Sequence, residues 1–303
     1  FAFLAIKNNY VKPKITKERI LSINKGRHPV VESLLPSTGK FIPNNIEMDA
    51  NTNQIHLLTG PNMAGKSTYL RQLGLMVVMA QIGCFVPAKK ASIGIVDKLF
   101  TRVGASDNLA GGESTFLVEM NEASNILNNA TDNSFILLDE VGRGTSTFDG
   151  LSLAWAITEH IHNTDGIRAR TIFATHYHEL TALEDNLIRL ENHHVEVKEF
   201  GDSIVFMRTI ARGSGDKSYG IQVAKMAGLP LKVVKRAEQI LEHHLGNDMV
   251  NRDETPDTSN DELVIFDDRD QLIKNKLKEI NLDSMTPIEA MKYLDDLKKE
   301  HNL

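Results

Sequence analysis

A glycine-rich segment has the residue types and spacing of a phosphate-binding loop, G-x-x-x-x-G-K-[ST]. It reads GPNMAGKS over residues 60–67. Glycines let backbone N–H groups wrap around phosphates, and the positive end of a following helix adds to the attraction. Lys66 would reach the β- and γ-phosphates of a nucleotide, and the Ser67 hydroxyl would bind Mg²⁺. A turn without a ligand is the alternative, and an apolar run before the segment with a helical pattern after it argues against that alternative.

Two adjacent carboxylates complete the metal and water chemistry that such a loop requires. Asp139 and Glu140 follow the apolar run 135–138. Asp139 would hold Mg²⁺, directly or through water, and Glu140 would orient or deprotonate the attacking water. Two acids that merely end a strand are the alternative, which the nearby phosphate loop disfavours.

His176, after the apolar run 171–175, is a candidate sensor of the γ-phosphate, with an ordinary strand-end histidine as the alternative. Zinc binding by His176, His178 and Glu179 is disfavoured because no further spaced ligand or cysteine pair accompanies them. We expect the remaining histidine pairs to be surface residues: His160 and His162, His193 and His194, and His243 and His244.

The elements that position these residues alternate along the chain. Apolar runs at 55–59, 135–138 and 171–175 are separated by helical patterns that include 66–81 and 151–161. This order predicts an α/β fold, a mixed and mainly parallel sheet covered on both faces by helices. Segments 195–200 and 203–210 flank Gly201-Asp202 and predict a hairpin. Helical patterns follow at 218–228 and 230–245.

Composition limits the cellular setting. The chain has 303 residues, 41% of them hydrophobic, which suffices for one large domain and a small one. No apolar run reaches the roughly 20 residues that cross a bilayer, and no secretory signal opens the chain. The single cysteine, Cys84, excludes an internal disulfide and fits a reducing compartment, so we expect a cytoplasmic protein without a membrane.

Acidic residues are concentrated in one segment of the C-terminal part of the chain. Residues 247–270 carry nine acidic side chains and two arginines, a net −7 that leaves +1 for the rest of a chain whose total is −6. We interpret this segment as a flexible linker. The near-neutral remainder lacks the basic excess of a nucleic-acid footprint. A capping box at 286–289 predicts a helix within 271–303, a segment too small to be stable alone.

Four segments together resemble the ATPase domain of the MutS family of DNA mismatch repair proteins. They read GPNMAGKSTYLRQ (60–72), GGESTFLVEM (111–120), LLDEVGRGTSTFDG (137–150) and ATHYHEL (174–180). The similarity extends from about Lys25 to Leu245. It implies a P-loop NTPase of the ABC-ATPase type, which binds ATP or ADP with Mg²⁺, hydrolyses ATP and works as a homodimer with composite sites.

The resemblance also assigns residues. Ser114 and Thr115 would act as a signature segment that completes the partner's nucleotide site, with an ordinary helix N-cap as the alternative. Phe41 would stack on adenine, with simple core packing as the alternative, and Arg208 stands where some relatives place a histidine against the base. The family commonly has glycine at Ala64. The nucleotide contacts would be Gly60, Pro61, Asn62, Met63, Ala64, Gly65, Lys66, Ser67 and Thr68.

The partners that the resemblance implies are DNA and a MutL-type protein. No Phe-x-Glu mismatch reader occurs in the chain, so DNA would be contacted through N-terminal domains outside it, and residues 1–24 would end the helix that leads from them. Residues 25–246 would be the ATPase and dimerisation domain. Residues 262–266 loosely resemble a sliding-clamp peptide, and 271–303 resembles an oligomerisation segment.

Two other functions compete with this one. A transporter-type ABC subunit is disfavoured because the signature reads GGESTF and residues 66–135 leave no room for a membrane-coupling insertion. A nucleotide-gated interaction module with little turnover stays open, because Glu140 shows that a base is present but not that it is aligned.

Overall fold

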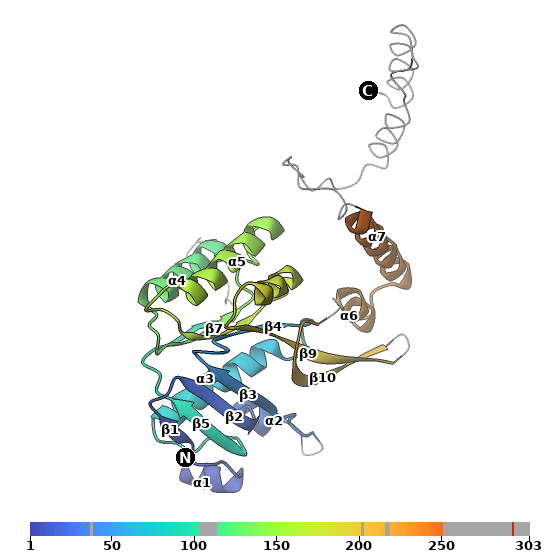
Figure 1. Ribbon diagram of the computed structural model, residues 1–303. Coiled ribbons are helices and arrows are strands. Elements are labelled where there is room, and N and C mark those ends of the chain that lie inside the picture. The colour runs from blue at the N-terminus through green and yellow to red at the C-terminus, as the bar shows by residue number, and fades with distance from the viewer. Residues whose placement is uncertain (37–38, 104–113, 201–202, 216–218, 251–292, 294–303) are drawn as a thin grey trace. The chain divides into compact units, whose positions relative to one another are not determined.

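The apolar runs of the sequence form the centre of a six-stranded sheet in the computed structural model (Figure 1). The structure describes residues 1–36, 39–103, 114–200, 203–215, 219–250 and 293. The strand order is β10-β9-β4-β8-β7-β6, parallel throughout except for the antiparallel pair of β9 and β10. The strands are β4 (Ile55–Thr59), β6 (Leu99–Arg102), β7 (Phe135–Asp139), β8 (Arg170–Ala174), β9 (Leu190–Phe200) and β10 (Ser203–Arg212).

Helices cover both faces of this sheet, which confirms the predicted α/β fold. On one face α3 (Lys66–Gln81) packs on residues such as Leu58 and Leu137. On the other face α4 (Thr115–Asn129) and α5 (Thr147–Asn163) pack on Leu57 and Leu138, with the 3₁₀ helix η1 (His178–Asp185) beside them. Every residue of β4, β7 and β8 is buried, and these strands are accordingly rich in apolar residues, with His56 and Arg170 among the buried exceptions.

A second sheet was not predicted. It has four strands in the order β1-β5-β2-β3 and shares one hydrophobic cluster with α3, to which Ile23, Ile46 and Leu73 contribute. Its strands alternate buried and exposed residues or are very short, so they produce no continuous apolar run. The elements are β1 (Lys14–Thr16), β2 (Ile20–Gly26), β3 (Asn44–Asp49) and β5 (Lys90–Gly94), with α1 (Ala2–Lys7) and α2 (Pro29–Leu34) nearby in sequence.

The predicted hairpin is present as β9 and β10, and α6 (Gly220–Met226) and α7 (Leu231–Val250) follow it. Because α7 continues to Val250, residues 247–250 are helical, and the predicted linker does not begin at 247. The rest of that linker, the clamp-like peptide and the capping box lie outside the described residues. The chain divides into two units, Phe1–Gln239 and Ile240–Leu303.

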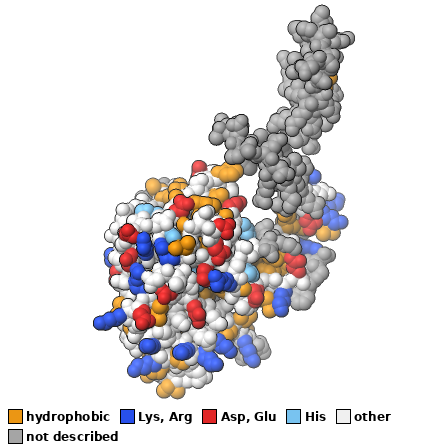
Figure 2. All heavy atoms as spheres, in the orientation of Figure 1, with side chains coloured by type: hydrophobic (Ala, Val, Ile, Leu, Met, Phe, Trp, Pro, Cys, Tyr) orange, Lys and Arg blue, Asp and Glu red, His pale blue; other side chains and the backbone are white. Residues whose placement is uncertain are grey.

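The described surface carries mixed charge. On the face drawn in Figure 2, acidic and basic side chains are interspersed rather than gathered by sign. Among the described helices, none combines the length and apolar character that crossing a bilayer demands.

Candidate functional site

The phosphate loop connects β4, in the middle of the sheet, to the first residue of α3. Gly60 and Gly65 have φ values of 136° and 108°, a region that strongly favours glycine. A Cβ at Gly60 would also lie 3.2 Å from the Cβ of Val195. Gly65 is the N-cap of α3, so the loop leads directly into the helix N-terminus. The N–H groups of the first helical turn have no partner within the helix, and such a helix end suits a phosphate.

Ala64 packs its side chain into the protein core. Its methyl group is 1% exposed and belongs to the core cluster beneath α3. Met63, in contrast, is 81% exposed and has a left-handed φ of 69°. The loop is therefore anchored by Ala64 and open at Met63.

Lys66 is buried and turns back over the loop. Its side chain is 4% exposed, and Nζ donates to the carbonyl oxygens of Gly60 and Pro61, the latter at 3.3 Å. Burial lowers the pKa of Lys66, and the charges of Glu140 and Asp139 oppose that shift. Nζ lies 3.9 Å from Oε1 of Glu140, so the lysine cation lies next to the carboxylate of the proposed base.

Asp139 ends β7 and is 8% exposed. Burial raises the pKa of its carboxyl group, while a hydrogen bond with the Ser67 side chain lowers it. Its Oδ1 atom is buried and has no partner among the described residues. A buried, unpartnered carboxylate oxygen beside a hydroxyl is a donor set suited to a hard cation, so Ser67 and Asp139 fit Mg²⁺.

Glu140 adopts a strained backbone at the point where β7 turns away from the sheet. Its φ is 54°, and its N–H donates to the Ala174 carbonyl at 2.8 Å. Oε2 forms an ion pair with Nη1 of Arg143 at 2.6 Å. Non-glycine residues with positive φ are uncommon and cluster at functional sites. The turn directs the Glu140 carboxylate toward Lys66 instead of continuing the strand.

His176 follows β8, the strand between β4 and β7, and is exposed. Its ring lies 4.1 Å from that of Tyr177, at an interplanar angle of 36°. Burial of part of the ring lowers the pKa of His176, and Glu140 opposes this shift. The imidazole is therefore neutral at pH 7 and lies at the same carboxyl edge of the sheet as the loop.

A pocket of about 270 Å³ beside the loop brings Phe41 and Arg208 together with Thr68 and the residues Met63, Ala64 and Gly65. Phe41 is half-buried. Arg208 has a φ of 56° in a bulge of β10. Asn44, which sequence reasoning missed, holds this bulge: it donates to the Arg208 carbonyl at 2.9 Å and accepts from the Ile210 N–H at 2.8 Å.

Ser114 and Thr115 are exposed at the start of α4 and do not line that pocket. Ser114 occupies the N-cap position, but its side chain makes no capping hydrogen bond. Ser114 is therefore the helix N-cap of the alternative interpretation, although its side chain makes no capping bond, and its action on a partner's nucleotide stays a prediction. Neither residue lines the pockets that border the phosphate loop.

Sequence reasoning also missed a support behind Glu140. The carboxylate of Glu119, on α4, accepts from the Gly142 N–H at 2.5 Å and pairs with Nη2 of Arg102 at 3.1 Å. The Tyr177 hydroxyl donates to the Gly142 carbonyl at 3.0 Å. Both Glu119 and Arg102 are buried. The sequence did carry a signal for this role, because Glu119 is a charged residue on the otherwise apolar side of a helical pattern.

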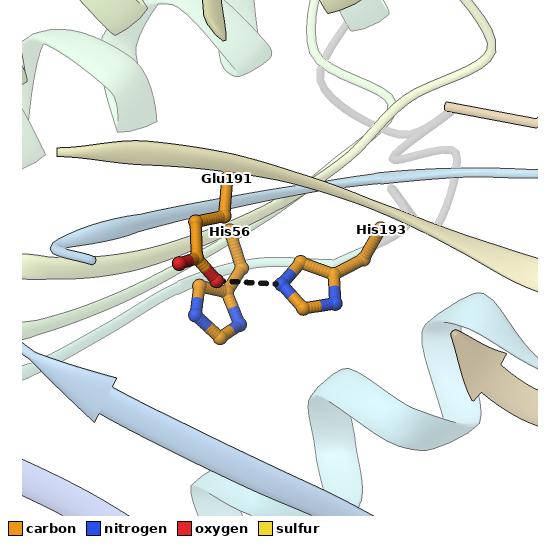
Figure 3. Close-up of side chains that lie close together, drawn as sticks. All are labelled: His56, Glu191 and His193. Carbon is orange, nitrogen blue, oxygen red and sulfur yellow. Dashed lines mark ion pairs between the residues drawn. The ribbon is translucent and has the colours of Figure 1, made fainter. Parts of the chain in front are cut away.

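Of the histidines expected at the surface, one is buried and another is half-buried. His162 is 5% exposed and packs beside Arg189, whose N–H lies 3.2 Å from its Nε2. The His193 side chain is 15% exposed and stacks on buried His56 (Figure 3). The surface assignment is therefore wrong for His162, and His193 is partly covered by its stack on His56. The side chains of His243 and His244 lie outside the described residues.

Together the fold and the site define an α/β protein with a glycine-rich loop at the carboxyl edge of a mainly parallel sheet, an arrangement that supports nucleotide binding. Residues 56–244 match the family described as MutS domain V. The chain is 52% identical over 98% of its length to the DNA mismatch repair protein MutS of Clostridium kluyveri. It is 49% identical over 99% of its length to the proteins of that name from Caldicellulosiruptor bescii and Methanococcoides burtonii.

The chain belongs to the MutS family. It spans about a third of the length of these relatives, 35% of each.

Proposed function

We propose that residues 25–246 form the ATP-binding, ATP-hydrolysing and dimerising domain of a MutS-type DNA mismatch repair protein. The observation that carries the proposal is the convergence of Lys66, Glu140, Asp139 and Ser67 on one glycine-rich loop. Lys66 Nζ is 3.9 Å from Glu140 Oε1, and the interaction with the Ser67 side chain lowers the pKa of Asp139. The names of the relatives support the link to mismatch repair.

The chain's own residues bind and orient the nucleotide. Backbone N–H groups of residues 60–68, except Pro61, which has none, hold the phosphates, and the Lys66 cation turns from the loop carbonyls to the β- and γ-phosphate oxygens. Ser67 and Asp139 would hold Mg²⁺, and the bound ion would supply charge neutralisation at the phosphates. Phe41 and Arg208 enclose the base in the neighbouring pocket.

Glu140 orients the attacking water and accepts its proton, and His176 contacts the γ-phosphate. Glu140 is held between Lys66 and Arg143. Arg143 is 62% exposed, so it can move aside when a water and a phosphate enter. Glu119 and Tyr177 keep the turn after Glu140 in place through Gly142. Correct alignment of this base decides turnover.

Ser114 and Thr115 act on the nucleotide of a partner chain. Their exposure and the absence of a capping bond leave an available helix N-terminus, which attracts a phosphate. Two composite sites then form per homodimer. ATP hydrolysis switches the parent protein between conformations on DNA, which the domains outside this chain contact, and a MutL-type protein recognises the ATP state. We also propose that the parent protein binds a sliding clamp and works in the cytoplasm, near DNA.

ATP hydrolysis measured with Mg²⁺ over a range of protein concentrations tests this function, with Glu140→Gln as the control. We expect a specific activity that rises with protein concentration and falls at least about 100-fold in the variant, while nucleotide binding persists. Nucleotide binding without turnover would contradict ATP hydrolysis and support the alternative function, a nucleotide-gated interaction module.

A mixing experiment tests the action in trans. Lys66→Met and Ser114→Arg should each be inactive, because one lacks the phosphate-binding cation and the other blocks the partner's site. A mixed dimer keeps one intact site, so an equimolar mixture should recover about a quarter of the wild-type rate for a statistical two-fold dimer. An inactive mixture whose chains do exchange would contradict completion by Ser114.

A further inference from the structure

A cluster of His56, Glu191 and His193 lies on one face of the paired strands β4 and β9 (Figure 3). Parallel pairing places His56 opposite Glu191 and Leu58 opposite His193. Alternate residues of a strand share a face, so all three polar side chains lie on the face to which Leu58 also belongs. Their nearest ligand atoms all lie within 4.8 Å of one another. The nucleotide chemistry uses none of these three residues.

The two imidazoles are neutral at pH 7. Burial lowers the pKa of His56 well below its ordinary value, with His193 and Arg212 adding to the effect. Burial, followed by the charge of Arg212, lowers the pKa of His193 to about 4. Each neutral ring keeps a lone pair on one nitrogen, which is the form in which histidine binds metal ions.

One ring nitrogen of each histidine has no hydrogen-bond partner among the described residues. The Nε2 atoms of His56 and His193 are both buried and unpartnered. His193 Nε2 is 3.6 Å from the Glu191 carboxylate, which is too long for a hydrogen bond, and a neutral ring forms no ion pair. The rings stack at 4.2 Å and 25° and do not satisfy each other. Buried polar atoms in this state require an explanation.

A cation would satisfy all three groups at once. Two nitrogens and one carboxylate oxygen form a ligand set that suits zinc-like ions better than Mg²⁺, which prefers oxygen ligands. An adjoining pocket of about 280 Å³, bordered by Glu47, Tyr69 and Arg212, leaves room for water as a further ligand. Arg212 pairs with Glu191 at 3.2 Å but is 71% exposed, so its side chain can leave.

We propose that His56, Glu191 and His193 bind one divalent transition-metal ion of the zinc class. Small side-chain rotations bring the three ligand atoms to the distances of about 2.0–2.2 Å from the ion that zinc requires. The ion ties β4 to β9, and β4 leads directly into the phosphate loop at Gly60. The site is separate from Ser67 and Asp139, so it stands whether or not the chain hydrolyses ATP.

The test titrates the untagged 303-residue chain with Co²⁺, followed by visible absorption, and then displaces Co²⁺ with Zn²⁺. Excess Mg²⁺, no nucleotide and an Asp139→Asn background keep the phosphate site from contributing. We expect one ion per chain and a rise in Tm that depends on metal concentration. Glu191→Gln should weaken binding at least about tenfold, since loss of a ligand costs no less than loss of a supporting residue.

Two further variants make the result decisive. Arg212→Ala should tighten metal binding, because it removes a cation that competes for Glu191, whereas damage to the fold would weaken it. His160→Gln, at an exposed histidine of α5, should leave binding unchanged. The proposal is overturned if no stoichiometric Co²⁺ spectrum appears, or if Glu191→Gln binds the metal as well as the unsubstituted chain does.

Discussion

At the scale of single residues, burial decides what each charged group in the site can do. Lys66 and Asp139 are both nearly inaccessible, and burial moves both pKa values toward the neutral form. Each group therefore carries a desolvation cost that a nucleotide and Mg²⁺ would offset. Such groups are typical of functional sites rather than of stabilising ion pairs.

Asp139→Asn separates this functional role from stability. The substitution removes a buried carboxylate whose charge burial disfavours, so the Tm without nucleotide should stay the same or rise. ATP hydrolysis should fall about 100-fold or more, with a higher requirement for Mg²⁺, because one metal ligand is weakened. Tm by calorimetry and hydrolysis rates against Mg²⁺ concentration provide the measurement. A large drop in Tm would instead indicate that Asp139 is structural.

His193 should make stability depend on pH. Its pKa is about 4 in the folded chain, against an ordinary 6.5, so the unfolded state binds more protons between these values. Stability should therefore be complete above pH 6.5 and fall by about 3 kcal/mol as the pH drops to 4. Urea unfolding with EDTA at pH 7 and pH 4 should show a smaller loss in His193→Gln. Equal losses in both proteins would disprove this linkage.

At the scale of elements, the first turn of α5 packs unusually close to the turn that follows Glu140. A Cβ at Gly150 would overlap the Gly142 carbonyl and the Tyr177 hydroxyl. Those two groups are hydrogen-bonded to each other at 3.0 Å. Gly150 therefore allows α5 to pack closely against the turn at Gly142 and against Tyr177, and no residue with a side chain fits at this position.

Gly150→Ala should reverse the usual effect of this substitution in a helix. Alanine in a helix ordinarily stabilises by about 1 kcal/mol, but here the overlap should destabilise by about 1–3 kcal/mol. ATP hydrolysis should fall as well, because Gly142 adjoins Glu140's turn. Gly220→Ala, in α6, is the matched control, since a Cβ there meets no atom of the described residues within 4 Å. Urea unfolding of both variants checks the prediction, which fails if their stabilities change alike.

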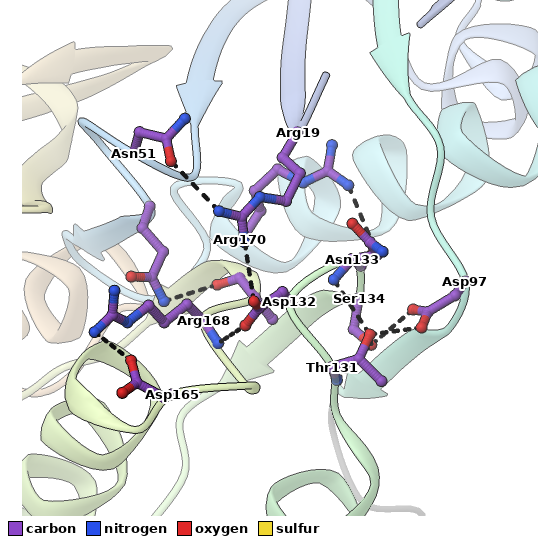
Figure 4. Close-up of polar contacts among 12 residues, drawn as sticks. Arg19, Asn51, Asp97, Thr131, Asp132, Asn133, Ser134, Asp165, Arg168 and Arg170 are labelled. Atoms are coloured by element: carbon purple, nitrogen blue, oxygen red, sulfur yellow. Dashed lines mark hydrogen bonds and ion pairs between the residues drawn. The ribbon is translucent and has the colours of Figure 1, made fainter. Parts of the chain in front are cut away.

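At the scale of the larger unit, a polar network at the amino edge of the main sheet joins it to the second sheet (Figure 4). Arg170, at the start of β8, is 1% exposed and donates to the Ile20 carbonyl at 2.7 Å and the Ile95 carbonyl at 3.3 Å. Burial lowers the pKa of its guanidinium to about 10. Arg19 pairs with Asp132 at 3.5 Å beside it. Structural polar contacts thus occupy the edge opposite the phosphate loop.

Arg170→Met should destabilise both sheets together. The substitution leaves buried carbonyl groups unpartnered and should cost about 2–4 kcal/mol. A single unfolding transition should persist, because the sheets share one core cluster. Arg168→Met, which removes a partly exposed pair with Asp165, should cost less than about 1 kcal/mol. Denaturation followed by circular dichroism and by fluorescence would expose separate transitions if the sheets unfolded independently.

The position of the glycine-rich loop and the core elements were predictable from the sequence because they depend on short-range pattern. The loop at residues 60–67 lies between β4 and α3 as predicted, and the strand before Asp139 agrees with the predicted run. Buried parallel strands are largely apolar, and this one-dimensional signal survives without any tertiary information.

Only the tertiary structure decided which distant residues meet. The second sheet was missed because its half-exposed strands alternate with polar residues, and Asn44 gained its role only from a bulge in β10 far along the chain. Glu119 supports the turn after Glu140 from another helix, and His193 joins His56 through strand register. Long-range packing determines burial, and burial sets protonation and hydrogen bonding, so these roles arise from the fold and not from residue type or spacing alone.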